Sequence, residues 1–193
     1  YIRSTAGQES TAPRFTSCGI TYNSSLAVQG AYSGAVHCDQ ADADFARPNR
    51  ERNDKVEVIP FRTITNMGPA GSINSCADDM ARWLQANIDG GKSSGTALVS
   101  TTTLGEIQKP QMVTGAEMER PDISPAAYGF GWMIETYRGH QHVSHGGAID
   151  GFMAHVSLFP KDRIGVVVLA NREATPLPGL VARHAADRLL ALE

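Results

Sequence analysis

Several features are scarce or missing in this 193-residue sequence. It has 17 lysines and arginines against 20 aspartates and glutamates, and no basic cluster that would suggest a nucleic-acid or anionic-membrane partner. No apolar run approaches the roughly 20 residues that span a bilayer, and no charged-then-apolar signal segment opens the chain. The chain begins at Tyr1 rather than Met, so we interpret it as a fragment or a processed product.

Cysteine is also scarce. Cys18, Cys38 and Cys76 are an odd number at unrelated spacing, which excludes a disulfide framework and a paired zinc motif. One bridge between Cys18 and Cys38 stays open, although we favour free, partly buried thiols. The hydrophobic content of 41% and the charged content of 19% are ordinary for a globular domain that buries a core.

Residue patterns divide the chain into an irregular N-terminal segment, 1–55, and a domain over 56–193. The domain opens with Val56–Ile59, which alternates like a short strand. Helices are expected over 75–110: Ser75 is a candidate N-cap followed by acidic residues, and a second helix begins near Ser100.

The second half of the domain reads as strands with short connections, which favours an antiparallel sheet over 128–171. Its strands are expected at 128–137, 141–144, 152–159 and 164–169. The last of these is apolar on both faces, so both faces should be covered. A helix over 177–192 should pack on the sheet through an apolar stripe that includes Leu177, Leu180, Val181, His184, Ala185, Leu189 and Leu192. The fold class is therefore α+β, an antiparallel sheet packed by helices.

Three histidines, His140, His142 and His145, precede Gly146-Gly147. One interpretation is a zinc site, because His-x-His-x-x-His is similar to the start of the metallo-β-lactamase-like ligand motif. That motif has an aspartate where this chain has Ser144, and no later Asp and His stand in suitable surroundings. Without a metal, His140 and His142 are expected to be exposed turn and strand residues.

A longer series of blocks supports another interpretation. These blocks are Asn66–Ser75, Ala77–Leu84, Gly90-Gly91, Tyr128-Gly-Phe-Gly-Trp132, His145–Phe152, Phe159-Pro160 and Ile164–Asn171. In order and spacing they resemble the class C β-lactamase and penicillin-binding-protein-like family of serine hydrolases, over roughly residues 44–192. The resemblance implies the C-terminal part of a β-lactamase-like fold, which hydrolyses an amide, an ester or a D-amino-acid peptide by acyl transfer and needs no cofactor.

The family has three motifs, and His145-Gly146-Gly147 matches the third, Lys/His-x-Gly. The resemblance implies that His145 holds a substrate carboxylate or moves a proton, that Gly146 and Gly147 let the substrate lie against the strand, and that the Ala148 N–H serves the oxyanion hole. Tyr22 is the nearest candidate for the second-motif tyrosine, Tyr-x-Asn, although Ser24 replaces the asparagine. An ordinary loop or strand tyrosine is the other interpretation of Tyr22.

The first motif, Ser-x-x-Lys, is missing: no serine has lysine three residues later. Three hypotheses therefore stand: part of a serine hydrolase whose nucleophile lies elsewhere, an inactive relative acting as a binding or dimerising module, and the zinc hydrolase. The expected partners are a small-molecule or peptide substrate and either a second copy or a complementary N-terminal chain covering an exposed apolar face. The sequence leaves the location unknown, and the resemblance favours a periplasmic or secreted location over a cytoplasmic one.

Overall fold

The computed structural model describes part of the chain. The described residues are 14–17, 20–23, 46–62, 71, 73, 75–114, 123 and 127–192, with the backbone alone given for 14–17 and 20–23. The Cys18–Cys38 bridge that the sequence leaves open lies outside these residues. In the described parts, no helix is long and apolar enough to cross a membrane.

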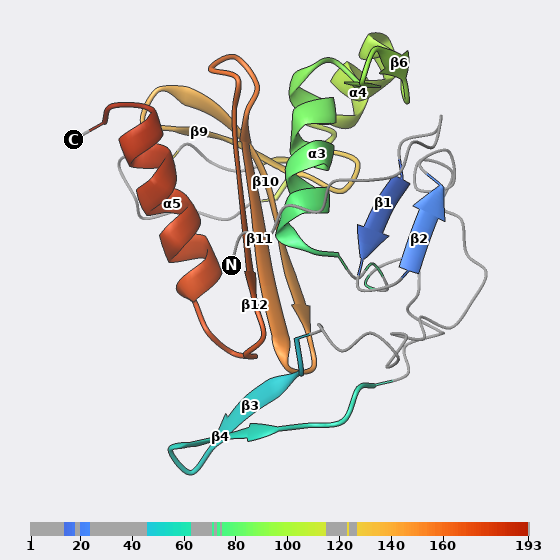
Figure 1. The fold of residues 1–193 in the computed structure, drawn as a ribbon. Coiled ribbons are helices and arrows are strands. Elements are labelled where there is room, and N and C mark those ends of the chain that lie inside the picture. Colours follow the sequence, from blue (N-terminus) through green and yellow to red (C-terminus); the bar gives the residue numbers. More distant parts are fainter. Residues whose placement is uncertain are drawn as a thin grey trace.

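A six-stranded antiparallel sheet forms the centre of the molecule, and its strand order follows the chain (Figure 1). Its strands are β7 (Met112–Val113), β8 (Ala127–Tyr128), β9 (Met133–Tyr137), β10 (His140–Ile149), β11 (Phe152–Phe159) and β12 (Ile164–Ala170). This confirms the expected α+β class and antiparallel sheet.

The sheet differs from expectation in three respects, the first being that β7 was not predicted. The single strand expected over 128–137 is divided into β8 and β9, because the chain turns through Gly131 at a φ of +80° and Gly129 N–H donates to the Trp132 carbonyl. Strand β10 is longer than the expected 141–144, since β11 pairs with it as far as Ile149. The His145-Gly146-Gly147 motif therefore lies within a strand.

Helices cover both faces of the sheet (Figure 1). Helix α3 (Ala77–Ile88) packs on one face of β12 and α5 (Leu177–Leu189) on the other, which confirms the expectation that both faces of this strand are covered. After α3 come a small hairpin, β5 (Lys92–Ser93) and β6 (Thr96–Ala97), and then α4 (Thr101–Ile107).

The two predicted helix starts fare differently. Helix α4 begins beside Ser100 as expected, and Ser100 also caps it, because its hydroxyl accepts a hydrogen bond from Thr103 N–H at 3.0 Å. The predicted N-cap at Ser75 is wrong by one residue: Cys76 holds the N-cap position, and the Ser75 hydroxyl donates to the Cys76 carbonyl.

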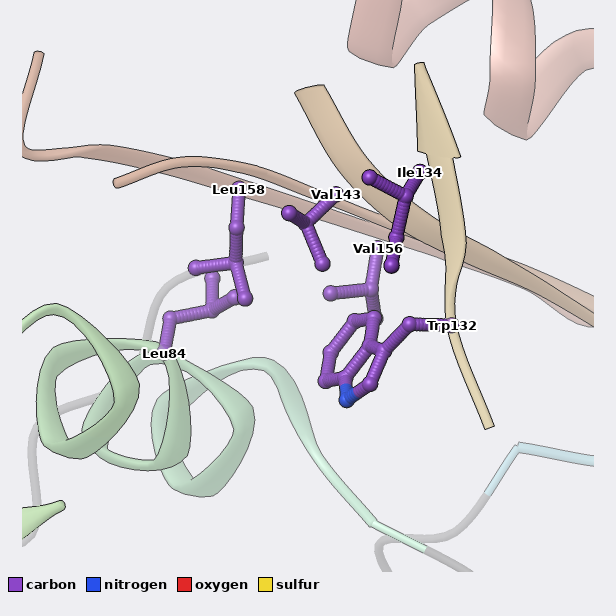
Figure 2. Close-up of a cluster of buried hydrophobic side chains, with 6 residues drawn as sticks. All are labelled: Leu84, Trp132, Ile134, Val143, Val156 and Leu158. Atoms are coloured by element: carbon purple, nitrogen blue, oxygen red, sulfur yellow. The ribbon is translucent and has the colours of Figure 1, made fainter. Parts of the chain in front are cut away.

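The main core lies between α3 and the sheet (Figure 2). Leu84 of α3 faces Val143 and Leu158 from the central strands, and Val143 is fully buried. Trp132 closes the same cluster and stacks on Trp83, with ring centroids 5.3 Å apart. The face of β10 that carries Val143 is therefore packed toward α3.

Helix α5 contacts the sheet through small residues instead of leucines. Ala182 and Ala186 are buried to within 1% of full burial, whereas Leu180 and Leu189 are 55% and 59% exposed. The expected inward stripe is therefore wrong for the leucines within α5, whereas Leu192, beyond the end of the helix, packs partly against a buried cluster. Because the side chains on this face are small, the helix backbone can lie close to the sheet. The face of the helix that carries the leucines is exposed.

Two further hairpins are described. One is β1 (Arg14–Ser17) with β2 (Ile20–Asn23), and the other is β3 (Asn49–Arg52) with β4 (Lys55–Val58), where the sequence predicts a strand. The second hairpin is anchored at the β10–β11 turn. There Asn49 N–H donates to the Gly151 carbonyl at 3.2 Å, and Phe61 stacks on Phe152.

Candidate active site

The second half of β10 has an open edge. Strand β9 pairs with β10 only as far as the Ser144–Met133 pair, and from His145 onward β11 is the partner of β10 among the residues that the structure describes. Residues 145–148 are exposed. Backbone N–H and C=O groups along an unpaired edge seek partners, and an extended ligand can supply them by adding itself as a strand.

His145 stands at the start of this open edge and is held by a tyrosine from β8. The Tyr128 Oη lies 3.0 Å from His145 Nε2, and His145 Nδ1 contacts the Gly146 carbonyl. A carbonyl can only accept, so Nδ1 carries a proton, and in the neutral ring Nε2 then accepts from the Tyr128 hydroxyl. A hydroxyl and an imidazole linked in this way can pass a proton along the edge.

The position of Tyr128 depends on the glycine after it. A side chain at Gly129 would meet the Ile107 carbonyl at 2.6 Å and the Lys109 carbonyl at 2.8 Å, so only glycine lets β8 lie against the end of α4. Sequence reasoning treated Tyr128 as a strand residue and missed its pairing with His145. The sequence feature that could have indicated this pairing was Gly129, because the close backbone approach at this glycine fixes the position of Tyr128.

The fold does not itself require glycine at 146 or 147. A β-carbon added at Gly147 would touch Ala154 Cβ at 3.4 Å, and one at Gly146 would lie 3.9 Å from the Ala154 carbonyl. Both are ordinary contacts. These glycines leave room on the exposed strand, as the predicted substrate-side role needs. Ala148 follows on the same open segment, opposite Met153 of β11.

Tyr22 is not tested as a site residue. Its backbone lies in β2 opposite Phe15 of β1, and its side chain lies outside the described residues. The roles predicted for Tyr22 and for His145 to Ala148 stay predictions.

The three histidines do not converge on one point. His140 Nδ1 pairs with Asp162 at 3.0 Å, His142 faces α5, and His145 lies on the opposite side of β10. Among the described residues, no group of three His, Cys, Asp or Glu side chains could hold a metal ion. The expectation that His142 is exposed is wrong: it is 8% exposed because α5 covers that face.

Comparison with known proteins identifies a family that matches nearly the whole chain. The family model described as Beta-lactamase matches residues 11–191. The unguisins hydrolase ungD of Aspergillus violaceofuscus is 31% identical over 128 residues, which are 62% of this chain and 22% of that protein. A D-aminopeptidase of Cereibacter sphaeroides is 43% identical over 68 residues, 35% of this chain and 12% of that protein.

Solved structures share the fold. The octameric penicillin-binding protein homologue from Pyrococcus abyssi has a TM-score of 0.68 at 23% identity, covering 79% of this chain and 33% of that one. A class C beta-lactamase has a TM-score of 0.52 at 16% identity, covering 76% and 42%. The chain thus spans less than half the length of each of these proteins.

Proposed function

The chain belongs to the beta-lactamase family of hydrolases, and from this premise we propose that it forms one wall of a serine-hydrolase acyl-transfer site. The observation that carries the proposal is the open edge of β10, which begins at a histidine hydrogen-bonded to Tyr128. An amide or ester substrate lies extended along this edge, with its backbone pairing to residues 145–148.

Each group on the edge has a role in acyl transfer. The Ala148 N–H donates to the oxygen that becomes negative in the tetrahedral intermediate. The protonated form of the His145 ring attracts a substrate carboxylate, and the His145–Tyr128 pair can carry a proton toward the leaving group. The substrates proposed are amides, esters and D-amino-acid peptides, supported by relatives named as an unguisins hydrolase and a D-aminopeptidase.

The nucleophile of this reaction comes from outside the chain, because no serine in the 193 residues belongs to a Ser-x-x-Lys motif. We propose that the outer face of α5 is covered by the portion of the family's fold that this chain lacks. This face is formed by Leu177, Leu180, Val181 and Leu189. The chain spans 22% of its fungal relative, which leaves ample length for that part. Purified alone, the chain should hydrolyse poorly, since only binding and oxyanion contributions remain.

A binding experiment on the chain alone tests the site. We expect acetyl-D-alanyl-D-alanine to shift the amide NMR signals of residues 145–149 and of Tyr128. His145→Ala removes the partner of the ligand carboxylate and should weaken this binding, whereas His184→Ala changes an exposed histidine of α5 and should not. Absence of shifts at millimolar ligand, or shifts confined to other strands, contradicts the proposal.

A second experiment separates the alternatives. The chain is incubated with a chromogenic ester and with a labelled β-lactam, with and without chelator, and its mass in solution is measured. Turnover lost on chelation supports the zinc hydrolase. No turnover together with a dimer that Leu180→Ser dissociates supports the inactive dimerising module, and the octameric structural neighbour makes such assembly worth measuring.

A further inference from the structure

A serine, a histidine and a glutamate from three neighbouring strands contact one another in series on the face of the sheet that α5 covers. The Ser157 Oγ of β11 lies 3.0 Å from His142 Nε2 of β10, and His142 Nδ1 lies 2.7 Å from Glu135 Oε1 of β9. This is the order of contacts of a Ser–His–acid triad, which is recognised by geometry on any fold. The site lies on the face of the sheet opposite His145, so the proposed acyl-transfer wall does not use it.

The histidine ring is fixed in this orientation. It stacks on Phe159, with centroids 4.7 Å apart and planes at 14°, and Tyr137 lies tilted against it at 6.1 Å. The Glu135 carboxylate accepts from Nδ1–H, which leaves Nε2 as the acceptor that faces the Ser157 hydroxyl. The imidazole therefore holds the tautomer that a general base needs.

The small residues of α5 leave a cavity over this serine. It measures about 50 Å³ and is lined by Ser157 and His142, with the half-buried His155, Gly179 and Arg183 among its other walls. A drug-sized ligand needs roughly 300 Å³ or more, whereas one water needs about 10–15 Å³. Only a group of a few heavy atoms fits beside Ser157.

The walls of the cavity also carry positive charge. Arg183 makes no hydrogen bond or ion pair with any residue that the structure describes, and it lines the cavity together with Ser157. Burial is the main cause that lowers the pKa of His155, and the nearby His142 and Arg183 add to it, so this ring stays neutral at pH 7. Arg183 is the permanently charged cation among the lining residues, and the Glu135 carboxylate faces the same cavity.

We propose that Ser157, His142 and Glu135 form a second nucleophilic site that accepts a small electrophile, of the size of an acetyl or methylsulfonyl group. The Ser157 Oγ forms a bond to the acyl carbon while its proton passes to His142 Nε2. Glu135 stabilises the imidazolium, and Arg183 stabilises the negative oxygen of the intermediate. The bond to the leaving group then breaks, and the proton on Nε2 passes to that group, which leaves an ester on Ser157.

Methanesulfonyl fluoride is the first probe, because it is small and its reaction releases only fluoride and a proton. We expect a single methylsulfonyl mass increment, mapped by peptide mass spectrometry to Ser157. Phenylmethanesulfonyl fluoride carries a ring that exceeds the cavity and should label at least tenfold more slowly. No label on Ser157 of the unsubstituted chain, under conditions in which the reagent labels a known serine hydrolase, overturns the proposal.

Substitutions then separate a triad from a merely buried hydrogen-bond network. His142→Gln should slow labelling about 100-fold or more through loss of the general base. Glu135→Gln should slow it too, with partial recovery in Glu135→Asp. Ser144, which lies opposite Ser157 on β10, is the matched control, and Ser144→Ala should keep the label. Labelling that His142→Gln leaves unchanged, in a variant with a native circular dichroism spectrum, contradicts the proposal.

Discussion

Gly139 and Gly151, two glycines in left-handed turns, differ in how closely other parts of the chain approach them. The effect of this difference on stability can be measured. Gly151, between β10 and β11, has a φ of +81°, and Gly139, between β9 and β10, has a φ of +90°. A β-carbon at Gly151 would lie 2.2 Å from Pro48 Cβ and 2.7 Å from Asn49 N, whereas one at Gly139 meets nothing within 4 Å. Alanine is strained at both positions, but only at Gly151 does it also collide with backbone.

The magnitudes follow from these two terms. Left-handed backbone costs an alanine about 1–2 kcal/mol at either turn. At Gly151 the collision pushes the segment at Pro48 away and weakens the hydrogen bond from Asn49 N–H to the Gly151 carbonyl, which adds about 1–3 kcal/mol. For a chain of this size each kcal/mol lowers the Tm by about 2–4 °C, so Gly151→Ala should melt about 2–12 °C below Gly139→Ala.

Thermal unfolding followed by circular dichroism measures the difference between the two variants. Chemical denaturation gives the free energy of unfolding independently and should rank them in the same order. Equal losses in the two variants would refute the reasoning, because they would mean that the β3–β4 hairpin is not held against the β10–β11 turn.

Three further predictions concern the site and the core. His145→Ala should keep the wild-type unfolding midpoint, because the ring is exposed. The same variant should bind carboxylate ligands with lower affinity in calorimetry. A variant that fails to fold would contradict this prediction. Leu158→Ala, at 1% exposure, should lose about 2–5 kcal/mol of unfolding free energy, whereas Leu180→Ala, at 55%, should lose under about 0.5. His155 has a lowered pKa when folded, chiefly through burial, so it contributes stability above its ordinary pKa of 6.5 that is lost as the pH falls through the lower folded value. Denaturation at pH 8 and pH 5 should show this loss in the wild type and less of it in His155→Gln.

The sequence predicts β11 and β12 well because each is apolar or alternates between clear turn residues, whereas β3 and β7 were not predicted. The β11 bounds, Phe152–Phe159, match those expected. Helix α5 shows where such prediction stops. Its leucines form a proper amphipathic stripe, yet the sheet is contacted by the alanines between them. Periodicity identifies a helix, but which stripe packs inward depends on how closely the neighbouring layer approaches.

The candidate site divides in the same way. His145 and its glycines are contiguous in sequence, so a motif proposes them as site residues, and their roles stay predictions. The partners of His145 and His142 lie on other strands, at Tyr128, Glu135 and Ser157, and strand register is what brings them together. His142 was expected on the surface because the covering helix begins 35 residues later in the chain, and no local pattern reports it.

The order of strands in the central sheet has a consequence for folding. From β7 to β12 every strand pairs with the one that precedes or follows it in the chain, so no pairing has to wait for a distant segment. Such local topology lowers the entropy lost in closing loops and speeds folding. Once the described strands have emerged from the ribosome, each already has a pairing partner next to it in the chain. We expect this sheet to be a folding unit in its own right, and pulse-labelled hydrogen exchange should show β10, β11 and β12 protected together in the earliest phase.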